Sequence, residues 1–355
     1  MALTDTATDV RPGEALDGAR IDAWLKAHLP DLQGTPNIRQ FPGGASNLTY
    51  LLQYPQRELV LRRPPFGHKA RSAHDMGREF RILNALRPAF AYCPQALLHC
   101  TDEAIIGAEF YVMERVEGII LRTDLPEALN FDPSSTRRLC ESFIDRLVEL
   151  HHVDYVACGL GDLGKPVGYV QRQVGGWSER YDQARTPDAP AWNTVKSWLR
   201  DKQPPDSGRV SLLHNDYRFD NVILDPADPL RIIGVLDWEL ATLGDPLMDL
   251  GNSLAYWIEA DDPAPLQWMR RQPSDAPGML SREAFVAYYA QRAGIGVSNM
   301  DFYRVYGLFR LAGIIQQIYF RFYHGQTADP RFASFIHMNG LLEQMGLQVI
   351  EQSRL

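Results

Sequence analysis

The sequence predicts an α+β fold in which a small antiparallel sheet is followed by a mainly helical region. Short apolar runs with strand character lie between residues 38 and 113 and are separated by turns rich in glycine and proline. Helical periodicity of apolar residues dominates after residue 134 and again after residue 249. At 355 residues, the chain is long enough to bury a full core in one large or two medium domains.

Apolar patterning places the individual elements in chain order. The expected strands of the sheet cover residues 38–40, 48–52, 58–65, 96–98 and 110–113. The expected helices cover residues 19–28, 70–86, 134–151, 249–258, 281–293, 300–323 and 331–353, and residues 166–198 also have a helical pattern. In the helix over 134–151, the apolar residues Leu139, Phe143, Leu147 and Leu150 form the stripe expected to be buried.

Charge and cysteine usage exclude several classes of partner. The formal net charge of −8 at pH 7 argues against binding to nucleic acid or to an anionic membrane, because both are driven by positive surface. The four cysteines show no C-x-x-C spacing, which favours a reducing compartment. No apolar run is long enough to span a bilayer, and the first residues carry no targeting pattern. We therefore expect a cytoplasmic protein, and no pattern in the sequence indicates its oligomeric state.

A β-hairpin is expected in the segment 211–249, which gathers more acidic and amide residues within an apolar frame than any other part of the chain. Two apolar runs, residues 222–224 and 232–236, flank residues 225–229, whose sequence DPADP is typical of a turn between strands. Chemistry is most strongly indicated at the end of this hairpin where the polar residues gather.

Acidic and amide side chains flank the expected hairpin at one end. His214, Asp216 and Asn221 lie on the loop that enters its first strand, and Asp237 follows its second strand. This spacing of carboxylates and an amide suits a hard cation with oxygen ligands, so Mg²⁺ fits better than zinc. In phosphoryl transfer, one Asp accepts a hydroxyl proton while an Asn and a second Asp hold the metal against the phosphates. We therefore predict that Asp216 is catalytic and that Asn221 and Asp237 bind the metal.

The order of these residues resembles the aminoglycoside phosphotransferase family of small-molecule kinases, over roughly residues 37 to 350. The branch with kinase-like domains that are sometimes fused to acyl-CoA dehydrogenases is the most similar. The matching motifs are His214-Asn215-Asp216-x4-Asn221, Leu236-Asp237-Trp238-Glu239 and Gly244-Asp245-Pro246-x2-Asp249.

The resemblance implies a protein-kinase-like fold with two lobes, ATP and Mg²⁺ as cofactors, and a small-molecule hydroxyl as the phosphoryl acceptor. Residues 1–36 would form an N-terminal arm with a short helix. Residues 37–116 would form the N-lobe with the phosphate loop and the hinge. Residues 117–355 would form the C-lobe with the catalytic loop and the substrate-binding helices.

A glycine-rich turn, residues 41–47, is the expected phosphate loop and is similar to the shorter phosphate loop of small-molecule kinases. Gly43 and Gly44 let backbone N–H groups approach phosphate oxygens, and Ser46 and Asn47 add side-chain donors. An ordinary hairpin turn is the alternative. The position of this turn ahead of a strand pair and far upstream of the acidic loop favours the phosphate role.

The strand over residues 58–65 carries the expected phosphate-contacting cation. The kinase pattern has a lysine on this strand, where this sequence has Arg62 on the same face as Val60. Arginine stays charged and grips phosphate bidentately, with a solvated strand end as the alternative. Arg63 is expected to be solvated.

Two further nucleotide-site assignments follow from the resemblance. Glu79, midway along the helix over 70–86, is similar to the glutamate that pairs with the strand cation, and a surface partner four residues away is the alternative. The connector from Glu114 to Val116 resembles the hinge between lobes whose backbone groups hydrogen-bond an adenine edge.

Several side chains of the helical region have two interpretations. Arg310 could reach an anionic substrate group, and a solvated or ion-paired arginine is the alternative. Three aromatic residues could line a substrate cleft, with buried aromatic packing as the alternative: Trp177, Tyr181 and Trp192. His151 and His152 are expected to pack or cap rather than bind a metal, because adjacent histidines on a helix point to different faces.

A small molecule is the expected acceptor. Only a few residues separate Asp237 from Gly244, which leaves little room for the activation segment of a protein kinase. The resemblance to dehydrogenase-associated domains favours a hydroxyacyl-CoA or a hydroxy acid. Two alternatives remain. One is a catalytically weak or inactive nucleotide-binding module, consistent with Arg62. The other is a metallohydrolase built on His214, Asp216 and Asp237, which lacks the further histidine ligands of such sites.

Overall fold

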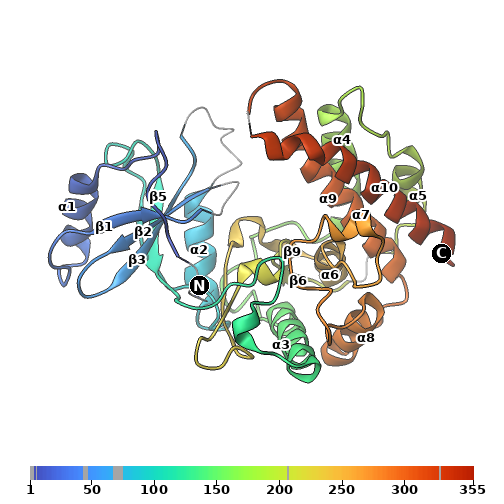
Figure 1. The fold of residues 1–355 in the computed structure, drawn as a ribbon, viewed down its shortest axis with the longest axis horizontal. Coiled ribbons are helices and arrows are strands. Elements are labelled where there is room, and N and C mark those ends of the chain that lie inside the picture. The colour runs from blue at the N-terminus through green and yellow to red at the C-terminus, as the bar shows by residue number, and fades with distance from the viewer. Residues whose placement is uncertain (1–3, 5, 43–46, 67–74, 206–207, 328) are drawn as a thin grey trace. The chain divides into compact units, whose positions relative to one another are not determined.

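The computed structural model describes residues 4, 6–42, 47–66, 75–205, 208–327 and 329–355 (Figure 1). The chain divides into two compact units. The first unit contains Met1–Ile120, Val156–Leu160 and Val222–Glu239, and the second contains Leu121–Tyr155, Gly161–Asn221 and Leu240–Leu355. A small antiparallel sheet in the first unit and mainly helices in the second confirm the expected α+β, kinase-like fold class.

An antiparallel sheet of five strands forms the frame of the first unit. The strands lie in the order β1 (Asn37–Gln40), β2 (Leu48–Gln53), β3 (Glu58–Arg63), β5 (Phe110–Glu114) and β4 (Ala96–Cys100). Leu59 and Leu61 of β3 join a buried cluster that includes Ile21 and Leu25 of helix α1 (Gly18–His28). Because side chains alternate across a strand, Arg62 faces away from this cluster.

Helix α2 (Met76–Leu86) packs against β4 and β5. Asp75 caps its N-terminus, since an Asp75 carboxylate oxygen accepts a hydrogen bond from the Arg78 N–H at 2.8 Å. The part of the expected helix over residues 70–74 lies outside the described residues. Glu79 lies in the first turn of α2 and is buried.

The hairpin expected around the acidic segment is confirmed. Strands β7 (Val222–Leu224) and β8 (Ile232–Val235) pair antiparallel. Backbone hydrogen bonds join Leu224 to Ile119 in both directions, at 2.8 and 2.9 Å, so the hairpin belongs to the first unit. The lobe boundary expected at residue 117 stays a prediction, and the compact units divide the chain at different places.

The second unit is built around the long helix α9 (Met300–Tyr323), which contacts α4, α5, α6 and α10. Its other helices are α3 (Pro133–His151), α4 (Tyr169–Ala184), α5 (Asn193–Asp201), α6 (Pro246–Ala255), α7 (Ala264–Gln267), α8 (Arg282–Ala293) and α10 (Phe335–Gln352). Gly251 and Gly307 allow α6 and α9 to approach closely, because a Cβ on Gly307 would lie 2.1 Å from the Gly251 carbonyl oxygen. The expected buried stripe of α3 is confirmed.

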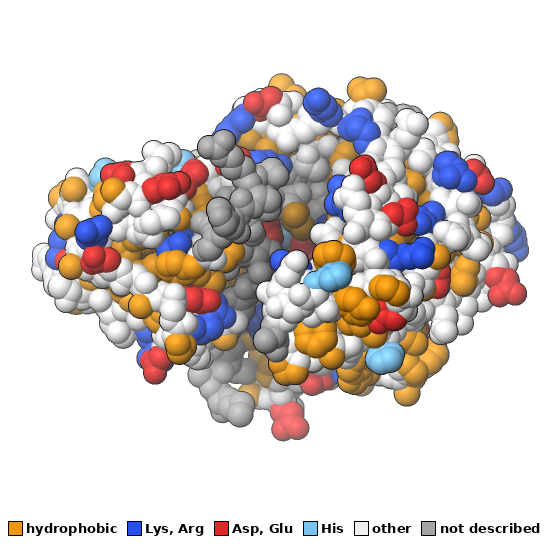
Figure 2. Space-filling view, turned by 90° about the horizontal axis from the view of Figure 1, so that it is seen from above, with side chains coloured by type: hydrophobic (Ala, Val, Ile, Leu, Met, Phe, Trp, Pro, Cys, Tyr) orange, Lys and Arg blue, Asp and Glu red, His pale blue; other side chains and the backbone are white. Residues whose placement is uncertain are grey.

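A short strand pair in the second unit was not predicted. Strand β6 (Ser211–Leu213) pairs antiparallel with β9 (Thr242–Gly244), and each has only three residues. This pairing holds the start of the acidic loop beside the residues that enter α6. Within the described ranges, no helix combines the length and the apolar character needed to cross a membrane. Acidic, basic and apolar side chains are interspersed over the face shown in Figure 2.

Candidate functional site

The loop after β6 brings Asp216 and Asn221 together, as the sequence predicted. The Asn221 side-chain amide donates hydrogen bonds to the Asp216 carbonyl oxygen at 2.8 Å and to its carboxylate Oδ2 at 3.0 Å. Asn221 ends a short 3₁₀ turn, Phe219–Asn221, that leads directly into β7. The turn therefore fixes the distance between the carboxylate and the amide.

Arg218 holds the Asp216 carboxylate from a second direction, a role that was not predicted from the sequence. Its Nε lies 3.1 Å from Asp216 Oδ1, and its Nη2 lies 3.2 Å from Oδ2. The guanidinium also contacts Asp220 at 3.3 Å and lies 4.6 Å from the ring centroid of Tyr256. Burial acts against the positive charge, but the Asp216 and Asp220 carboxylates outweigh it and raise the pKa of Arg218. In the sequence, the signal for this role was the position of Arg218, two residues after Asp216.

Asp249 of helix α6 anchors the backbone of this loop. Its two carboxylate oxygens accept hydrogen bonds from the His214 and Asn215 N–H groups, each at 2.7 Å. His151 Nε2 lies 3.2 Å from the same carboxylate. Burial alone would raise the pKa of Asp249, but the hydrogen bond from His151 and the charge of the histidines lower it below its usual value. Asp249 therefore acts as a buried, ionised anchor.

Backbone strain in the loop is relieved by local hydrogen bonds. Asn215 has a positive φ of 64°, a conformation that asparagine tolerates better than most residues. Its side-chain amide donates to the Leu240 carbonyl oxygen at 3.0 Å, and its Oδ1 accepts from Asn252 at 3.1 Å. The Asp216 N–H donates to His214 Nδ1 at 3.2 Å. His214 therefore orients the loop, as expected from the sequence.

In the first unit, Arg62 pairs with Glu79. Arg62 Nη1 lies 2.6 Å from Glu79 Oε1, and both side chains are buried. Arg62 Nη2 also lies 3.0 Å from Asp237 Oδ1. Although burial acts to lower it, the carboxylates of Glu79 and Asp237 raise the pKa of Arg62 well above its ordinary value. The arginine is a permanent cation that contacts two acidic site candidates.

Glu239 extends this cluster and was not predicted to take part. Its Oε2 accepts a hydrogen bond from the Asn47 side-chain amide at 2.8 Å and lies 3.9 Å from Arg62 Nη2. Asp237, two residues earlier, has a positive φ of 66°, which lets the chain turn immediately after β8. The described end of the glycine-rich turn is thereby connected to the end of the hairpin through Asn47.

The remaining nucleotide-site candidates stay predictions. Gly43, Gly44 and Ser46 lie outside the described residues. Glu114 ends β5, and its Oε1 accepts a hydrogen bond from Arg57 at 3.2 Å. Val116 lies two residues further along and is half-buried. No hydrogen bond assigns a role in adenine binding to this connector among the residues that the structure describes.

The prediction that Arg63 is solvated is wrong. Arg63 is only 2% exposed, and it donates hydrogen bonds to the carbonyl oxygens of Pro64 and Ile106, each at 3.0 Å. Its guanidinium lies 3.7 Å from the ring centroid of Phe66. Arg63 lies on the same face of β3 as Leu59 and Leu61, because side chains two residues apart in a strand point to the same side. Its burial therefore follows from the period of the strand.

The oxygen donors expected for Mg²⁺ are suited to a hard cation. The Asn221 amide nitrogen is engaged by Asp216, and Asp237 Oδ1 is engaged by Arg62. Among the described residues, nothing hydrogen-bonds Asn221 Oδ1 or Asp237 Oδ2. Each side chain therefore keeps one carbonyl or carboxylate oxygen for a metal that prefers oxygen ligands and retains several waters. The residues present fit the ion.

Comparison with known proteins identifies the family and the fold. A family model described as "Phosphotransferase enzyme family" matches residues 37–303. "Acyl-CoA dehydrogenase family member 11" of Gallus gallus is 33% identical over 360 residues, which cover 98% of this chain and 45% of the relative. The chain thus spans less than half the length of this curated relative.

Solved structures show the same fold. A crystal structure from Ralstonia eutropha, assigned as an aminoglycoside phosphotransferase, has a TM-score of 0.81 and 30% identity, covering 96% of this chain and 100% of that chain. A ternary complex of a phosphotransferase with streptomycin and ATP has a TM-score of 0.55 and 13% identity, covering 85% of this chain and 90% of that chain, and shows the fold alone. The chain therefore belongs to the phosphotransferase enzyme family, as its motif order had indicated.

Proposed function

We propose that the protein transfers the γ-phosphoryl group of ATP to a hydroxyl of a small molecule in a Mg²⁺-dependent reaction. The observation that carries this proposal is the Asp216 carboxylate, held at 3.0 Å by Asn221 on a loop that Asp249 anchors. Family membership supports phosphoryl transfer to a small molecule. A positioned carboxylate is the group that such a transfer needs to orient the attacking hydroxyl.

Asp216 is proposed to accept the proton of the acceptor hydroxyl and to orient its oxygen toward the phosphorus. Arg218 and Asn221 keep the carboxylate in one orientation, so that the reacting geometry is set before the acceptor binds. Asn221 and Asp237 are the residues proposed to hold Mg²⁺. When bound, the ion would offset the charge that develops on the phosphate oxygens.

Arg62 is proposed to contact the nucleotide phosphates, with Glu79 fixing its orientation through the contact at 2.6 Å. Asn47 is proposed to donate to phosphate together with Gly43, Gly44 and Ser46 of the same turn. The connector from Glu114 to Val116 is proposed to bind the adenine edge through its backbone. These cationic and N–H groups supply the local positive potential that a chain of net charge −8 needs to bind ATP.

The finer proposal is that the acceptor is a hydroxyacyl-CoA or a related hydroxy acid. The support is the dehydrogenase name of a relative that this chain matches over 98% of its own length. An acyl-CoA dehydrogenase oxidises a carbon–carbon single bond of an acyl thioester, so its name points to acyl-CoA substrates, and a kinase would need a member of that class that carries a hydroxyl group.

The test is an ATP-consumption screen of the full chain over hydroxyacyl-CoA thioesters, free hydroxy acids, sugars, choline and aminoglycosides. We expect Mg²⁺-dependent ATP consumption with at least one hydroxylated acceptor. We expect Asp216→Asn to lower turnover by roughly 10²–10⁴-fold while binding of Mg-ATP is retained. Asp228→Asn, on the exposed turn of the β7–β8 hairpin, is the matched control and should keep normal turnover. Near-normal turnover of Asp216→Asn would refute the assigned role.

A nonenzymatic nucleotide-binding module is the second candidate, and the contact between Arg62 and Asp237 at 3.0 Å favours it. In that case Arg62 would neutralise the Asp237 carboxylate in place of a metal ion. Thermal stabilisation by Mg-ATP, with no ATP consumption across the whole acceptor panel, would establish this function instead.

A further inference from the structure

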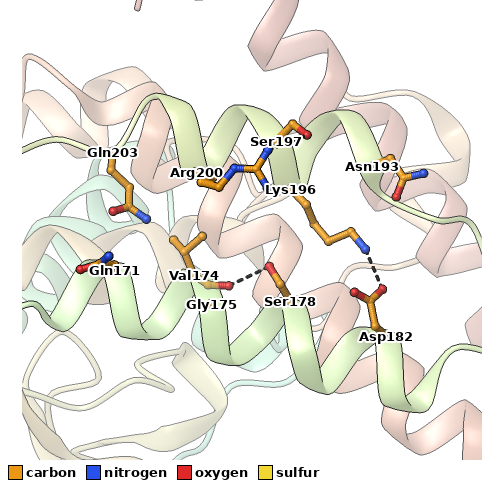
Figure 3. Close-up of a pocket in the computed structure, with 10 residues that line it drawn as sticks. All are labelled: Gln171, Val174, Gly175, Ser178, Asp182, Asn193, Lys196, Ser197, Arg200 and Gln203. Atoms are coloured by element: carbon orange, nitrogen blue, oxygen red, sulfur yellow. Dashed lines mark hydrogen bonds and ion pairs between the residues drawn. The ribbon is translucent and has the colours of Figure 1, made fainter.

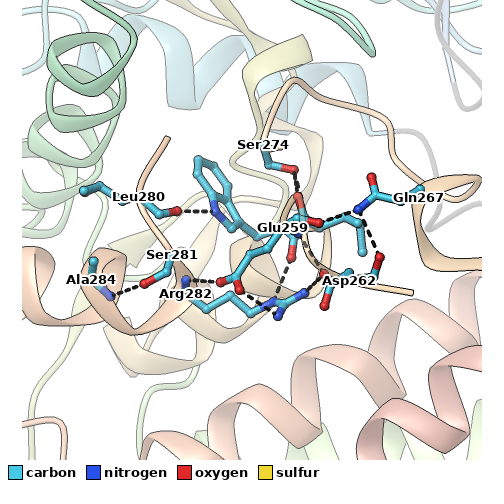
Figure 4. A network of polar contacts seen from close by, with 10 residues as sticks. Glu259, Asp262, Gln267, Ser274, Leu280, Ser281, Arg282 and Ala284 are labelled. Carbon is cyan, nitrogen blue, oxygen red and sulfur yellow. Dashed lines mark hydrogen bonds and ion pairs between the residues drawn. The ribbon is translucent and has the colours of Figure 1, made fainter. Parts of the chain in front are cut away.

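Arg310 is the exception among the buried arginines of this chain. Arg62, Arg63 and Arg282 are each between 2% and 8% exposed, and each makes hydrogen bonds or ion pairs. Figure 4 shows the case of Arg282, whose guanidinium donates to the Trp257 carbonyl oxygen at 2.9 Å and pairs with Glu259 and Asp262. Arg310 is 5% exposed and has no hydrogen bond or ion pair with any residue that the structure describes.

An unpaired buried charge is costly, so its presence requires an explanation. Removing a cation from water without a partner costs several kcal/mol, and natural proteins almost always pair such groups. Among the described residues, the ion-paired alternative for Arg310 is not seen, and at 5% exposure the side chain is buried. None of its nitrogens is among the buried atoms that are both fully enclosed and unpartnered, so each keeps a small exposed area.

A second arginine lies over the same aromatic ring. The guanidinium carbon of Arg180 lies 4.1 Å from the ring centroid of Trp177, and that of Arg310 lies 5.5 Å from it. Arg180, which is exposed, also has no hydrogen bond or ion pair within the described part of the chain. Burial and the nearby charge of Arg310 lower the pKa of Arg180. Two like charges thus converge on one tryptophan with no carboxylate between them.

The fold holds this ring in place. A Cβ on Gly313 would lie 2.9 Å from Trp177 Cε3, so the absence of a side chain at this position lets the indole of α4 pack directly on α9. Gly313 follows Arg310 by three residues on the same helix, which places it on the same face. The cation–π contacts and the helix packing therefore hold both guanidinium groups near one indole ring.

Arg310 lies on α9, which contacts α6, the helix whose Asp249 anchors the loop that carries Asp216. Tyr256 lies beneath Arg218, the residue that clamps Asp216. Burial, opposed in part by Arg310, and the negative charge of Asp216 raise the pKa of Tyr256 to about 12. The charges of both Asp216 and Arg310 therefore act on one tyrosine.

We propose that Arg180, Trp177 and Arg310 bind an anionic group of the phosphoryl acceptor, a carboxylate or a phosphate. This inference rests on the proposed function, because it assigns the acceptor class of the same site. Arginine is suited to this task, since its planar fork matches both carboxylate and phosphate oxygens bidentately. The site selects hydroxylated acids over neutral alcohols, and it repels polycationic amines.

The surface pocket between α4 and α5 does not offer the same chemistry. This pocket of about 600 Å³ is lined by Gln171, Ser178, Lys196 and Arg200, among others (Figure 3). Its half-buried cation, Lys196, is already paired with Asp182 at 2.6 Å, and Arg200 is exposed at the helix surface. The unpaired charge that requires an anion lies at Trp177 and not in this pocket.

A binding experiment tests the anion site independently of catalysis. The full chain, with Mg-ADP present throughout, is titrated with malonate or methyl phosphate at constant ionic strength, and its Tm is measured. We expect either anion to raise the Tm of the wild type and of Arg321→Gln, an exposed arginine on α9, by a few degrees near saturation. We expect no rise in Arg180→Gln or Arg310→Gln. The larger of the two shifts identifies carboxylate or phosphate as the preferred group. An equal rise in all four proteins, or no rise in the wild type, would overturn the proposal.

A kinetic comparison tests the same site with the chemistry included. With 3-hydroxybutyrate as acceptor, Arg310→Gln should raise KM by roughly 10–100-fold with little change in kcat, whereas 3-hydroxybutyramide should show the same KM in both proteins. If anion binding depends on the arginines but ATP is not consumed with any acceptor, the anion site is supported and the kinase function is refuted. If ATP is consumed and KM is equal for the acid and its amide, the kinase function is supported and the anion site is refuted.

Discussion

Replacing the anchor Asp249 by asparagine tests how the catalytic loop is held. The carboxylate accepts two backbone N–H groups at 2.7 Å and lies 3.2 Å from His151 Nε2, in a fully buried position. The asparagine side chain of the variant would keep only one acceptor oxygen and would turn an NH₂ group toward a donor. The substitution has nearly the same volume, so the effect reports hydrogen bonding and charge rather than packing.

The expected loss follows from these contacts. A hydrogen bond to a charged group contributes about 1.5–3 kcal/mol, and at least one of the two backbone donors becomes unpaired in the variant. Breaking a buried charged interaction by removing one partner costs about 3–5 kcal/mol in total. We therefore expect Asp249→Asn to lower the free energy of unfolding by about 3–5 kcal/mol and to reduce turnover, because Asp216 follows the released backbone.

Urea unfolding followed by circular dichroism measures this loss as a shift of the midpoint at unchanged slope. The control is Asp261→Asn, an exposed aspartate for which a change below about 0.5 kcal/mol is expected. If Asp249→Asn changed the unfolding free energy by less than about 1 kcal/mol, the anchoring role of this carboxylate would be refuted.

Three further outcomes are expected. The pKa of Asp249 is lowered in the folded protein, so its stabilisation is present above about pH 4 and is lost as pH falls through the folded pKa. The difference in unfolding free energy between wild type and Asp249→Asn should therefore become smaller on acidification, and a difference that grows toward pH 3 would contradict this. Arg282→Met should lower the unfolding free energy by about 3–5 kcal/mol because it breaks a buried ion pair, whereas Arg310→Met should not lower it. Equal decreases of the urea midpoint in the two variants would count against Arg310 being unpaired. Glu79→Gln should lower the unfolding free energy by about 1.5–3 kcal/mol because it weakens the contact with Arg62, as differential calorimetry would show; an unchanged Tm would argue that this pair contributes nothing.

Elements whose signals are local were predictable from the sequence. The β7–β8 hairpin follows from two apolar runs around the turn at residues 225–229, and the contact of Asp216 with Asn221 follows from their spacing on one short turn. The pairing of Arg62 with Glu79 was expected from motif order, and the structure shows the two side chains in contact. In each case the partners are close in sequence or belong to one recurrent motif.

Features that depend on tertiary approach were not predictable. Arg218 and Glu239 join the clusters only because neighbouring segments bring a carboxylate or an amide within reach. The burial of Arg63 was missed because its place at the strand end suggested solvent exposure. Its side chain points to the same, core-facing side of β3 as that of Leu61. Arg310 is unpaired because no described acidic side chain lies within ion-pair distance of it, and no sequence pattern predicts the lack of such a neighbour.

The hydrogen bonds between Ile119 and Leu224 have a consequence for synthesis of the protein. The first unit draws on three separate stretches of chain, the last of which ends at Glu239. During translation, domains tend to fold as they emerge, but this unit lacks its final hairpin until residue 239 has left the ribosome. A fragment that stops after residue 120 would leave the Ile119 backbone without its partner Leu224, so the first unit in isolation would have to carry the hairpin through an engineered linker.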